Sequence, residues 1–262
     1  MEISLSQELY ETIFKRKSIR KFDPSPLDEK TLSPIKSFMD SLTPLDSSIS
    51  VKGKLVAAQE IKGLFHVKAP HYIVILSRRE KGYLTNAGFM YQQMDLFLSA
   101  QGLGCCWQGM AKPTQGEVLE SGFEVISVLA FGKPAEPLHR QSPLEFKRKP
   151  LQEITDIADS SELLEPCRLS PSAVNGQPWF FSGSSKEIQV HYVKANFLQA
   201  LIYDRLHQID LGIALCHLCL SALHAGKDFT FILADQGKPS RPSAPAGYHF
   251  LGSVRLSASE RK

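Results

Sequence analysis

The segment from Pro171 to Trp179 brings a hydroxyl, two carboxamides and an indole into one short stretch of the chain. Ser172, Asn175 and Gln177 lie between two prolines. Because proline fixes φ and removes a backbone donor, the segment cannot lie inside a helix, and it predicts a rigid extended turn. Asn and Gln each offer a donor and an acceptor, which suits a ligand with carbonyl and ring-nitrogen edges. An ordinary polar loop that leads into a buried strand has the same composition, so both interpretations stay open.

A second candidate segment, Lys15–Phe22, is basic. Arg16, Ser18 and Arg20 alternate along it, and in an extended chain alternate side chains share one side. Two guanidinium groups that flank a hydroxyl make a clamp for an anion, and phosphate is the natural guest. The alternative is a solvated charged edge, which is the commoner fate of a basic run. The strict alternation favours the phosphate clamp.

Composition excludes several other classes of protein. The 262 residues carry a net charge of only +3, with 43% apolar and 22% charged residues, as in soluble globular proteins. The two basic clusters, Lys15–Lys17 and Lys147–Lys149, fit one phosphate better than a polyanion, so no nucleic-acid partner is expected. The N-terminus lacks a signal pattern, and the longest apolar stretch, 211–223, is too short to span a bilayer. We therefore expect a cytoplasmic protein without a membrane partner.

The five cysteines have neither disulfide-framework nor metal-ligand spacing. Cys216 and Cys219 have the C-x-x-C form, but they lie in the middle of an apolar helical run. Cys105 and Cys106 are adjacent, so they cannot supply the second pair that a zinc site needs. We predict core packing for these thiols and no metal.

Hydrophobic patterns and glycine or proline breaks predict the elements that position the two segments. The expected elements are helices over 5–14, 26–39, 88–101 and 211–223, strands over 71–77, 125–131 and 179–181, a loop over 43–54, a tight loop over 105–109 and a polar connector over 138–149. The helix that ends at Gly102-Leu103-Gly104 is not a dinucleotide fingerprint, because that motif follows a strand and opens a helix.

The second half of the sequence repeats the first. Leu96–Ala100 followed by Gly104 matches Leu218–Ala222 followed by Gly226, at the same spacing. Such self-similarity indicates a duplicated unit, and two copies usually pack about a pseudo-twofold axis. We expect a first half over 1–145, which keeps the arginine–serine clamp, and a second half over 146–262, which keeps the Ser-Asn-Gln turn. One complete site would then be assembled from both halves.

Four motifs together resemble the nitroreductase family over nearly the whole chain. They are Arg16-Lys17-Ser18-Ile19-Arg20, Pro171-Ser172-x-x-Asn175-x-Gln177-Pro178-Trp179, Gly102-Leu103-Gly104 and Gly132-Lys133-Pro134. In most members both main motifs lie in one short subunit, and two subunits share two FMN sites. This chain splits the motifs, so it resembles the fused, single-chain branch of the TM nitroreductase type. The resemblance implies an α+β nitroreductase-like fold, mixed sheets packed by helices, and FMN held noncovalently between the halves.

The resemblance also implies roles for particular residues. Arg16, Ser18 and Arg20, helped by Lys17, would hold the phosphate and the pyrimidine end of the flavin, with Arg148 as a further phosphate partner. The ribityl chain and ring would contact Ser172 and Asn175, with Gln177 in the same turn and Pro171 lining the ring. The loop Trp107-Gln108-Gly109 would lie against the remaining face or at N5. The family implies no catalytic side chain, because the chemistry belongs to the flavin.

The implied function is an FMN-dependent oxidoreductase. Hydride would pass from NAD(P)H to flavin N5 and then, by ping-pong, to a nitroaromatic or quinone-like small molecule. The alternatives are a noncatalytic flavin-binding or sensing protein, and a duplicated scaffold that binds no flavin. A monomer is expected, because the dimer-like interface would be internal, and one FMN per chain, because clamp and turn each occur once.

Overall fold

The computed structural model describes the chain except for residues 1–2, 64, 115–119, 194–199, 235–245 and 260–262. It divides into two compact units, which we describe separately. The first unit is Phe14–Glu145, and the second unit combines Met1–Ile13 with Phe146–Lys262. The division after Glu145 falls where the sequence placed it. The first thirteen residues, which the sequence assigned to the first half, lie instead in the second unit.

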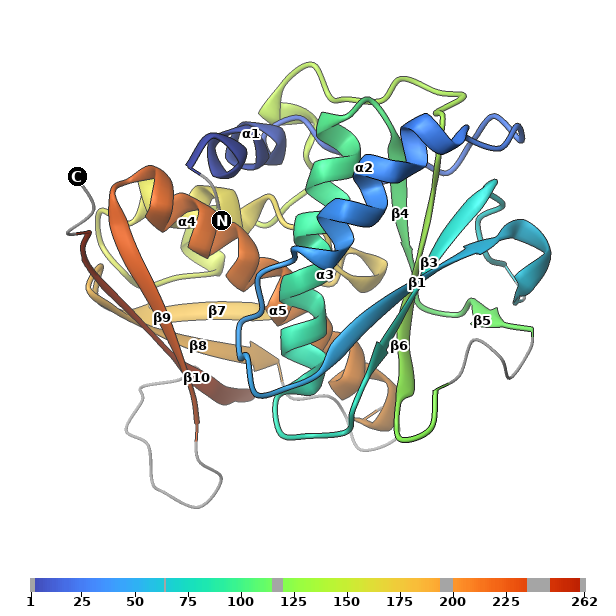
Figure 1. The fold of residues 1–262 in the computed structure, drawn as a ribbon. Helices are drawn as coiled ribbons and strands as arrows, with labels where there is room; N and C mark the ends of the chain where they lie inside the picture. Colours follow the sequence, from blue (N-terminus) through green and yellow to red (C-terminus); the bar gives the residue numbers. More distant parts are fainter. Residues whose placement is uncertain (1–2, 64, 115–119, 194–199, 235–245, 260–262) are drawn as a thin grey trace. The chain divides into compact units, whose positions relative to one another are not determined.

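The first unit is built on a four-stranded antiparallel sheet with the order β1-β3-β6-β4. The strands are β1 (Val51–Ala57), β3 (His71–Ser77), β4 (Gly104–Gln108) and β6 (Glu124–Gly132). Helix α3 (Tyr83–Ala100) packs against the sheet and contacts all four strands (Figure 1). A short antiparallel pair, β2 (Ile61–Lys62) and β5 (Lys112–Pro113), lies outside this sheet.

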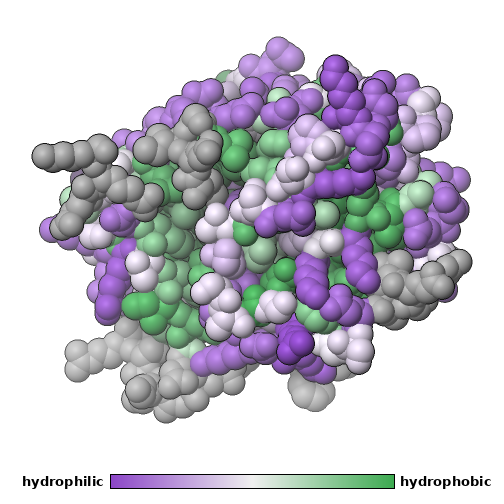
Figure 2. All heavy atoms as spheres, viewed as in Figure 1, coloured by the Kyte–Doolittle hydropathy of each residue, from purple (hydrophilic) through white to green (hydrophobic). Residues whose placement is uncertain are grey.

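Helices α2 and α3 of the first unit differ in how much of their surface is buried. Asp28 caps the N-terminus of helix α2 (Glu29–Asp40), and its carboxylate accepts the Thr31 N–H at 2.9 Å. It buries Leu32, Ile35 and Phe38 on one face, and its other residues give the hydrophilic surface seen over this helix in Figure 2. Helix α3 is buried from Tyr83 to Ser99, so its polar side chains must find partners inside the protein.

The second unit has the same strand order, β7-β8-β10-β9, again all antiparallel. The strands are β7 (Trp179–Gly183), β8 (Glu187–Val193), β9 (Lys227–Leu233) and β10 (Tyr248–Ala258). In each unit a long helix follows the second strand, and here it is α5 (Ala200–His224). Helix α5 packs against α4 (Ser161–Arg168) and α1 (Ile3–Ile13).

Packing on α5 explains why α1 lies in the second unit. Leu9, Thr12 and Ile13 are fully buried. The Tyr10 ring stacks on His224 of α5 with centroids 3.9 Å apart, and the Gln7 Oε1 lies 2.8 Å from His224 Nδ1. An amphipathic helix is stabilised mainly by packing of its apolar face, and for α1 this face packs against α5.

The structure confirms the strand over 71–77, and it extends the predicted strand 125–131 by one residue at each end. Two predicted loops were wrong. Residues 51–54 belong to β1, and Gly104–Gln108 form β4 in place of a tight loop, because they pair with β3 and β6 respectively. All pairings between the named strands are antiparallel, and the parallel pairings among the described residues are the isolated bridges from Ser18 to Cys105 and from Thr155 to Phe181. Strand pairing is a tertiary effect that local sequence pattern does not contain.

Among the described residues, one stretch, Tyr203–His224 of α5, is long and apolar enough to cross a membrane, and 72% of its apolar 18-residue window is buried inside the protein. Cys216 is buried there with 1% of its surface exposed, and no described cysteine is in a disulfide. The C-x-x-C pair therefore belongs to a packed core helix.

Candidate functional site

The turn 171–178 of the second unit has a strained backbone. Backbone bonds from the Asn175 N–H to the Ser172 carbonyl at 3.1 Å and from the Gly176 N–H to the Ala173 carbonyl at 2.9 Å close a tight turn, where an extended turn was predicted. Val174, Asn175 and Gln177 have φ values of 47°, 57° and 49°, in the left-handed region that favours glycine. Val174 is β-branched and also 85% exposed. Such outliers persist only where the surroundings impose them, and they cluster at ligand-binding sites.

Arg148 contacts this turn directly. Its Nη1 donates to Asn175 Oδ1 at 2.6 Å, and its Nε donates to the Ser170 carbonyl at 3.0 Å. Asn175 Nδ2 donates in turn to the Lys147 carbonyl at 2.9 Å. The basic segment and the turn, separated by 27 positions in the sequence, therefore form one cluster of cationic and carboxamide groups.

Gln177 has a different role from Asn175. It is 5% exposed, its Oε1 accepts the Lys149 N–H at 2.7 Å, and its Nε2 donates to the Asn175 carbonyl at 3.1 Å. The Gln177 N–H donates to Ser172 Oγ at 3.0 Å. Gln177 thus ties the turn to the basic segment, while Asn175 lies exposed on its surface.

Asp210 of α5 also contacts the turn. Its Oδ1 and Oδ2 lie 3.0 and 3.2 Å from the Ala173 nitrogen, and the residue is 3% exposed. Burial raises the pKa of this carboxyl to about 8, and the Ala173 N–H opposes that rise.

In the first unit the segment that carries the predicted clamp runs extended beside β4. Ser18 bridges Cys105, and the Ile19 N–H donates to the Cys105 carbonyl at 3.0 Å. Ile19 is fully buried. Further along, Phe22 forms an antiparallel bridge with Pro134, in the segment that follows β6. The predicted extended conformation is therefore present, and it is fixed by β4 and by the residues after β6.

Arg16 does not share an exposed side with Arg20. It is 1% exposed, and its Nε lies 2.9 Å from Oδ2 of Asp95 on α3, which is equally buried. The N–H direction is poor for a hydrogen bond at Nε, so the contact is an ion pair, supported by Nη2 at 3.4 Å from Asp95 Oδ1 and 3.3 Å from Ser18 Oγ. The structure thus gives Arg16 a carboxylate partner inside the unit, whereas Arg20 is exposed.

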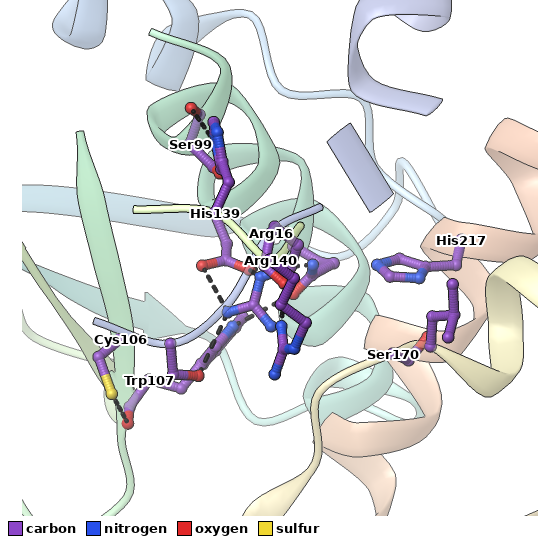
Figure 3. Close-up of polar contacts among 12 residues, drawn as sticks. Arg16, Ser99, Cys106, Trp107, His139, Arg140, Ser170 and His217 are labelled. Carbon is purple, nitrogen blue, oxygen red and sulfur yellow. Dashed lines mark hydrogen bonds and ion pairs between the residues drawn. The ribbon is translucent and has the colours of Figure 1, made fainter. Parts of the chain in front are cut away.

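A second arginine lies beside Arg16. Arg140 donates from Nη1 to the Arg16 carbonyl, and Figure 3 shows the two side chains next to each other below His139. Burial, followed by the charge of Arg16, lowers the pKa of Arg140 to about 10. His139 Nε2 lies 3.1 Å from Ser99 Oγ of α3, and burial lowers its pKa. This part of the unit is therefore rich in cationic groups.

Glu136 fixes the exposed end of the segment. Its Oε1 accepts the N–H groups of Arg20 and Lys21 at 2.7 and 3.1 Å, and its Oε2 lies 3.9 Å from Lys17 Nζ. The Arg20 N–H bond is the main reason why the pKa of Glu136 is lowered. The Arg20 backbone is thereby held while its side chain stays exposed.

The remaining predicted residues, Trp107, Gln108 and Gly109, lie at the end of β4. The Trp107 indole donates to Gln92 Oε1 of α3 at 3.2 Å. Gln108 is 6% exposed and its Oε1 accepts the Val67 N–H at 2.8 Å, which is a structural contact. Gly109 is exposed. Pro171 of the second unit is buried next to the turn that it starts.

Sequence reasoning missed Asp95, Asp210 and Arg140. An acidic residue in the predicted core helix 88–101 was the available signal for Asp95, because a buried carboxylate requires a partner. Asp210 directly precedes the predicted helix 211–223 and carried no comparable signal. Among the described residues, no group of three or more His, Cys, Asp or Glu side chains could hold a metal ion.

Comparison with known proteins identifies the family. The family described as "Putative TM nitroreductase" matches residues 8–222. A solved structure described as a "putative nitroreductase" from Thermotoga maritima is 22% identical, with a TM-score of 0.60, over 95% of this chain and 92% of that one. An "FMN-dependent Nitroreductase" from Clostridium difficile R20291 is 18% identical over 55% of this chain and 96% of its own, with a TM-score of 0.40.

A search among curated proteins found no match. The Thermotoga structure, at its low identity, shows the fold, which is α+β with the nitroreductase arrangement. The family match covers well over half of the 262 residues. The chain therefore belongs to this nitroreductase family, and that membership supports an oxidoreductase activity.

Proposed function

We propose that the chain is an FMN-dependent oxidoreductase that takes hydride from NAD(P)H and reduces a small nitroaromatic or quinone-like acceptor. The observation that carries the proposal is the bond from Arg148 Nη1 to Asn175 Oδ1, 2.6 Å long. It joins a cationic segment to a carboxamide turn in the second unit. Phosphate and a heteroaromatic ring with carbonyl edges are the two ends of FMN, and these are the groups that such donors bind.

The donor set of the described residues fits FMN. Arg20 and Lys17 of the first unit, and Arg148 of the second, are cationic and at least partly exposed. Asn175 keeps binding capacity beyond its two bonds to the protein, because a carboxamide has two N–H groups and two lone pairs on its oxygen. Ser172 is half-buried at the start of the same turn.

The burial of each side chain and its hydrogen-bond or ion-pair partners indicate whether it would bind FMN or position other residues. In the first unit, Arg20, Lys17 and Ser18 would bind phosphate, with Trp107 as an apolar surface. In the second unit, Arg148 would bind phosphate and Ser172 and Asn175 would bind the ribityl chain and the ring, with Pro171 as an apolar surface. Arg16, Gln177 and Gln108 would position these groups, since each is buried with a partner in its own unit. When bound, FMN would supply the hydride-accepting chemistry. A cation near the pyrimidine edge would stabilise the negative charge of the reduced ring.

Two measurements on the purified protein test the proposal. FMN binding is followed by quenching of flavin fluorescence, and reduction by loss of the yellow absorbance when NADH or NADPH is added without oxygen. We expect tight binding and NAD(P)H-dependent bleaching, followed by recovery of the colour when a quinone or nitroaromatic compound is added.

The outcomes separate the proposal from its two alternatives. Binding without bleaching by either nucleotide would indicate a flavin-binding or sensing protein. Absence of binding at micromolar FMN would indicate a scaffold that no longer uses flavin. A cytoplasmic location and a working monomer remain part of the proposal, and light scattering of the FMN-loaded protein tests the second.

A further inference from the structure

Asp210 is the one carboxylate that touches the backbone of the turn among the described contacts. Its two oxygens share the Ala173 N–H at 3.0 and 3.2 Å, and the side chain comes from the core helix α5. Burying a carboxyl group costs free energy of folding unless its hydrogen bonds offset that cost, so the contact between Asp210 and the turn requires an explanation.

In the first unit, a side chain of the long helix also accepts backbone N–H groups of a loop, but the residue is an asparagine. Asn86 of α3 accepts the N–H groups of Leu45 and Asp46 on its Oδ1 at 2.8 and 3.1 Å. Asp46 follows Pro44 by two positions, as Ala173 follows Pro171. In each unit, a side chain of the long helix therefore captures the N–H of the second residue after a proline.

The two loops differ in backbone strain. Residues 43–49 contain no non-glycine residue with positive φ, whereas the turn 171–178 contains three, Val174, Asn175 and Gln177. A loop without strained backbone conformations requires few bonds from other elements to keep its conformation. A turn with three left-handed residues must be held by bonds from outside, and Asp210 on α5 supplies one of them.

We propose that Asp210 is a positioning residue that holds the turn Ser172–Gln177 in the conformation in which Ser172 and Asn175 bind the flavin. The inference rests on the proposed function for its ligand. Asn86 supports it, because the equivalent contact in the unit without the Ser-Asn-Gln turn shows that a carboxamide can make the same bond. Burial raises the pKa of Asp210, and a protonated carboxyl still accepts the Ala173 N–H through its carbonyl oxygen.

Matched variants in the two units test the proposal. Asp210→Leu removes the acceptor, Asp210→Ala does so without adding bulk, and Asp210→Asn keeps it in the form that Asn86 has. Asn86→Leu is the control, because it removes the equivalent contact from the other loop. For each variant we would measure the Kd for FMN, the urea midpoint, and the hydrogen-exchange rate of the Ala173 amide.

We expect Asp210→Leu and Asp210→Ala to weaken FMN binding by about tenfold or more, as loss of an ordering hydrogen bond predicts, and to speed exchange at Ala173. Asp210→Asn should restore both values. Asn86→Leu should lower the urea midpoint with an unchanged Kd. Equal loss of FMN affinity in the Asn86 and Asp210 variants, or an unchanged Kd in Asp210→Ala, would overturn the proposal.

Failure of the proposed function gives a different result. If the wild-type protein bound no FMN, the ligand-binding part of the inference would fall with it. The exchange rate of the Ala173 amide would still decide whether Asp210 holds the turn, since that measurement needs no ligand.

Discussion

Arg16 Nε lies 2.9 Å from Asp95 Oδ2, with both side chains 1% exposed. This ion pair joins the segment beside β4 to the core helix α3. It gives the first arginine of the Arg-x-Ser-x-Arg motif a carboxylate partner inside its own unit, while Arg20, four positions later, is exposed. The two arginines of one motif should therefore respond differently to substitution.

The first prediction is that Arg16 contributes mainly to stability. Asp95→Asn or Arg16→Met leaves one charge buried without its partner, and we expect a loss of about 3–5 kcal/mol in the free energy of unfolding. Urea unfolding measures this. Lys36→Gln is the control, because its pair with Glu29, at 2.7 Å on the exposed side of α2, should contribute about 0–1 kcal/mol. Equal effects at both pairs would contradict the assignment.

The second prediction is that Arg20 contributes mainly to cofactor affinity. Arg20→Ala should leave the free energy of unfolding within about 0.5 kcal/mol, as for most exposed positions. It should weaken FMN binding by about 1.5–3 kcal/mol, because charge-assisted bonds to phosphate have that strength. Fluorescence titration with FMN decides this. Lys21→Ala, also exposed and next in sequence, should change neither quantity, and equal weakening in both variants would indicate a general charge effect.

The elements with strong local patterns could be predicted from the sequence. The β-branched run 71–77 forms a strand at those bounds, and the apolar run 211–223 lies in core helix α5. Strands β1 and β4 could not be predicted, because what makes them strands is their pairing with β3 and β6. The place of α1 in the second unit was beyond local reasoning for the same reason, since it depends on the apolar face of α5.

The candidate site divides in a similar way. The motifs grouped Arg148 with the phosphate clamp, whereas its bonds in the structure are to Asn175 and to the Ser170 carbonyl beside the Ser-Asn-Gln turn. Burial decides what each residue does, and burial is a tertiary property. Neither the pairing of Arg16 with Asp95 nor the use of Gln177 as a tie to Lys149 could be deduced from spacing.

The third prediction concerns the pH dependence of stability. Asp210 has a folded-state pKa of about 8, whereas an unfolded aspartate has a pKa of about 3.9. Between these values the folded state holds a proton that the unfolded state has lost, so the free energy of unfolding falls as pH rises, by at most about 1.4 kcal/mol per pH unit.

Asp210→Asn removes this ionisable group. The variant should match the wild type near pH 4 and become progressively more stable than the wild type toward pH 8. Urea midpoints across that range measure the difference. A difference independent of pH would show that Asp210 is ionised in the folded protein throughout.

The fourth prediction is one FMN per chain. The counterpart of the turn in the first unit is the loop 43–49, which has Leu45-Asp46-Ser47-Ser48 after Pro44 and no Asn or Gln. The counterpart of the clamp in the second unit, residues 154–162, carries three carboxylates and no arginine. Like charges repel a phosphate in a half-buried site.

Extraction of FMN from protein of known concentration gives the stoichiometry, and light scattering gives the mass. Two flavins per chain would show that the second pair of segments also binds. Activity that appears only in a dimer would contradict the expectation of a working monomer.

The last prediction uses the position of α1. Leu9 is fully buried in the second unit although it belongs to the first thirteen residues of the chain. Leu9→Ala should therefore destabilise the protein by about 2–5 kcal/mol, as removal of a buried leucine side chain usually does. Because the lost contacts belong to the second unit, amide protection should fall in α5 and residues 146–183, with little change in β1, β3 and β6.

Hydrogen exchange followed by mass spectrometry resolves these segments. Glu8→Ala is the control on the same helix, since that side chain is exposed and its loss should change the stability by less than about 0.5 kcal/mol. Loss of protection confined to the first unit would show that α1 packs with the residues that follow it in sequence. Loss of amide protection confined to the second unit would show that α1, at the start of the chain, completes the core formed by residues 146–262.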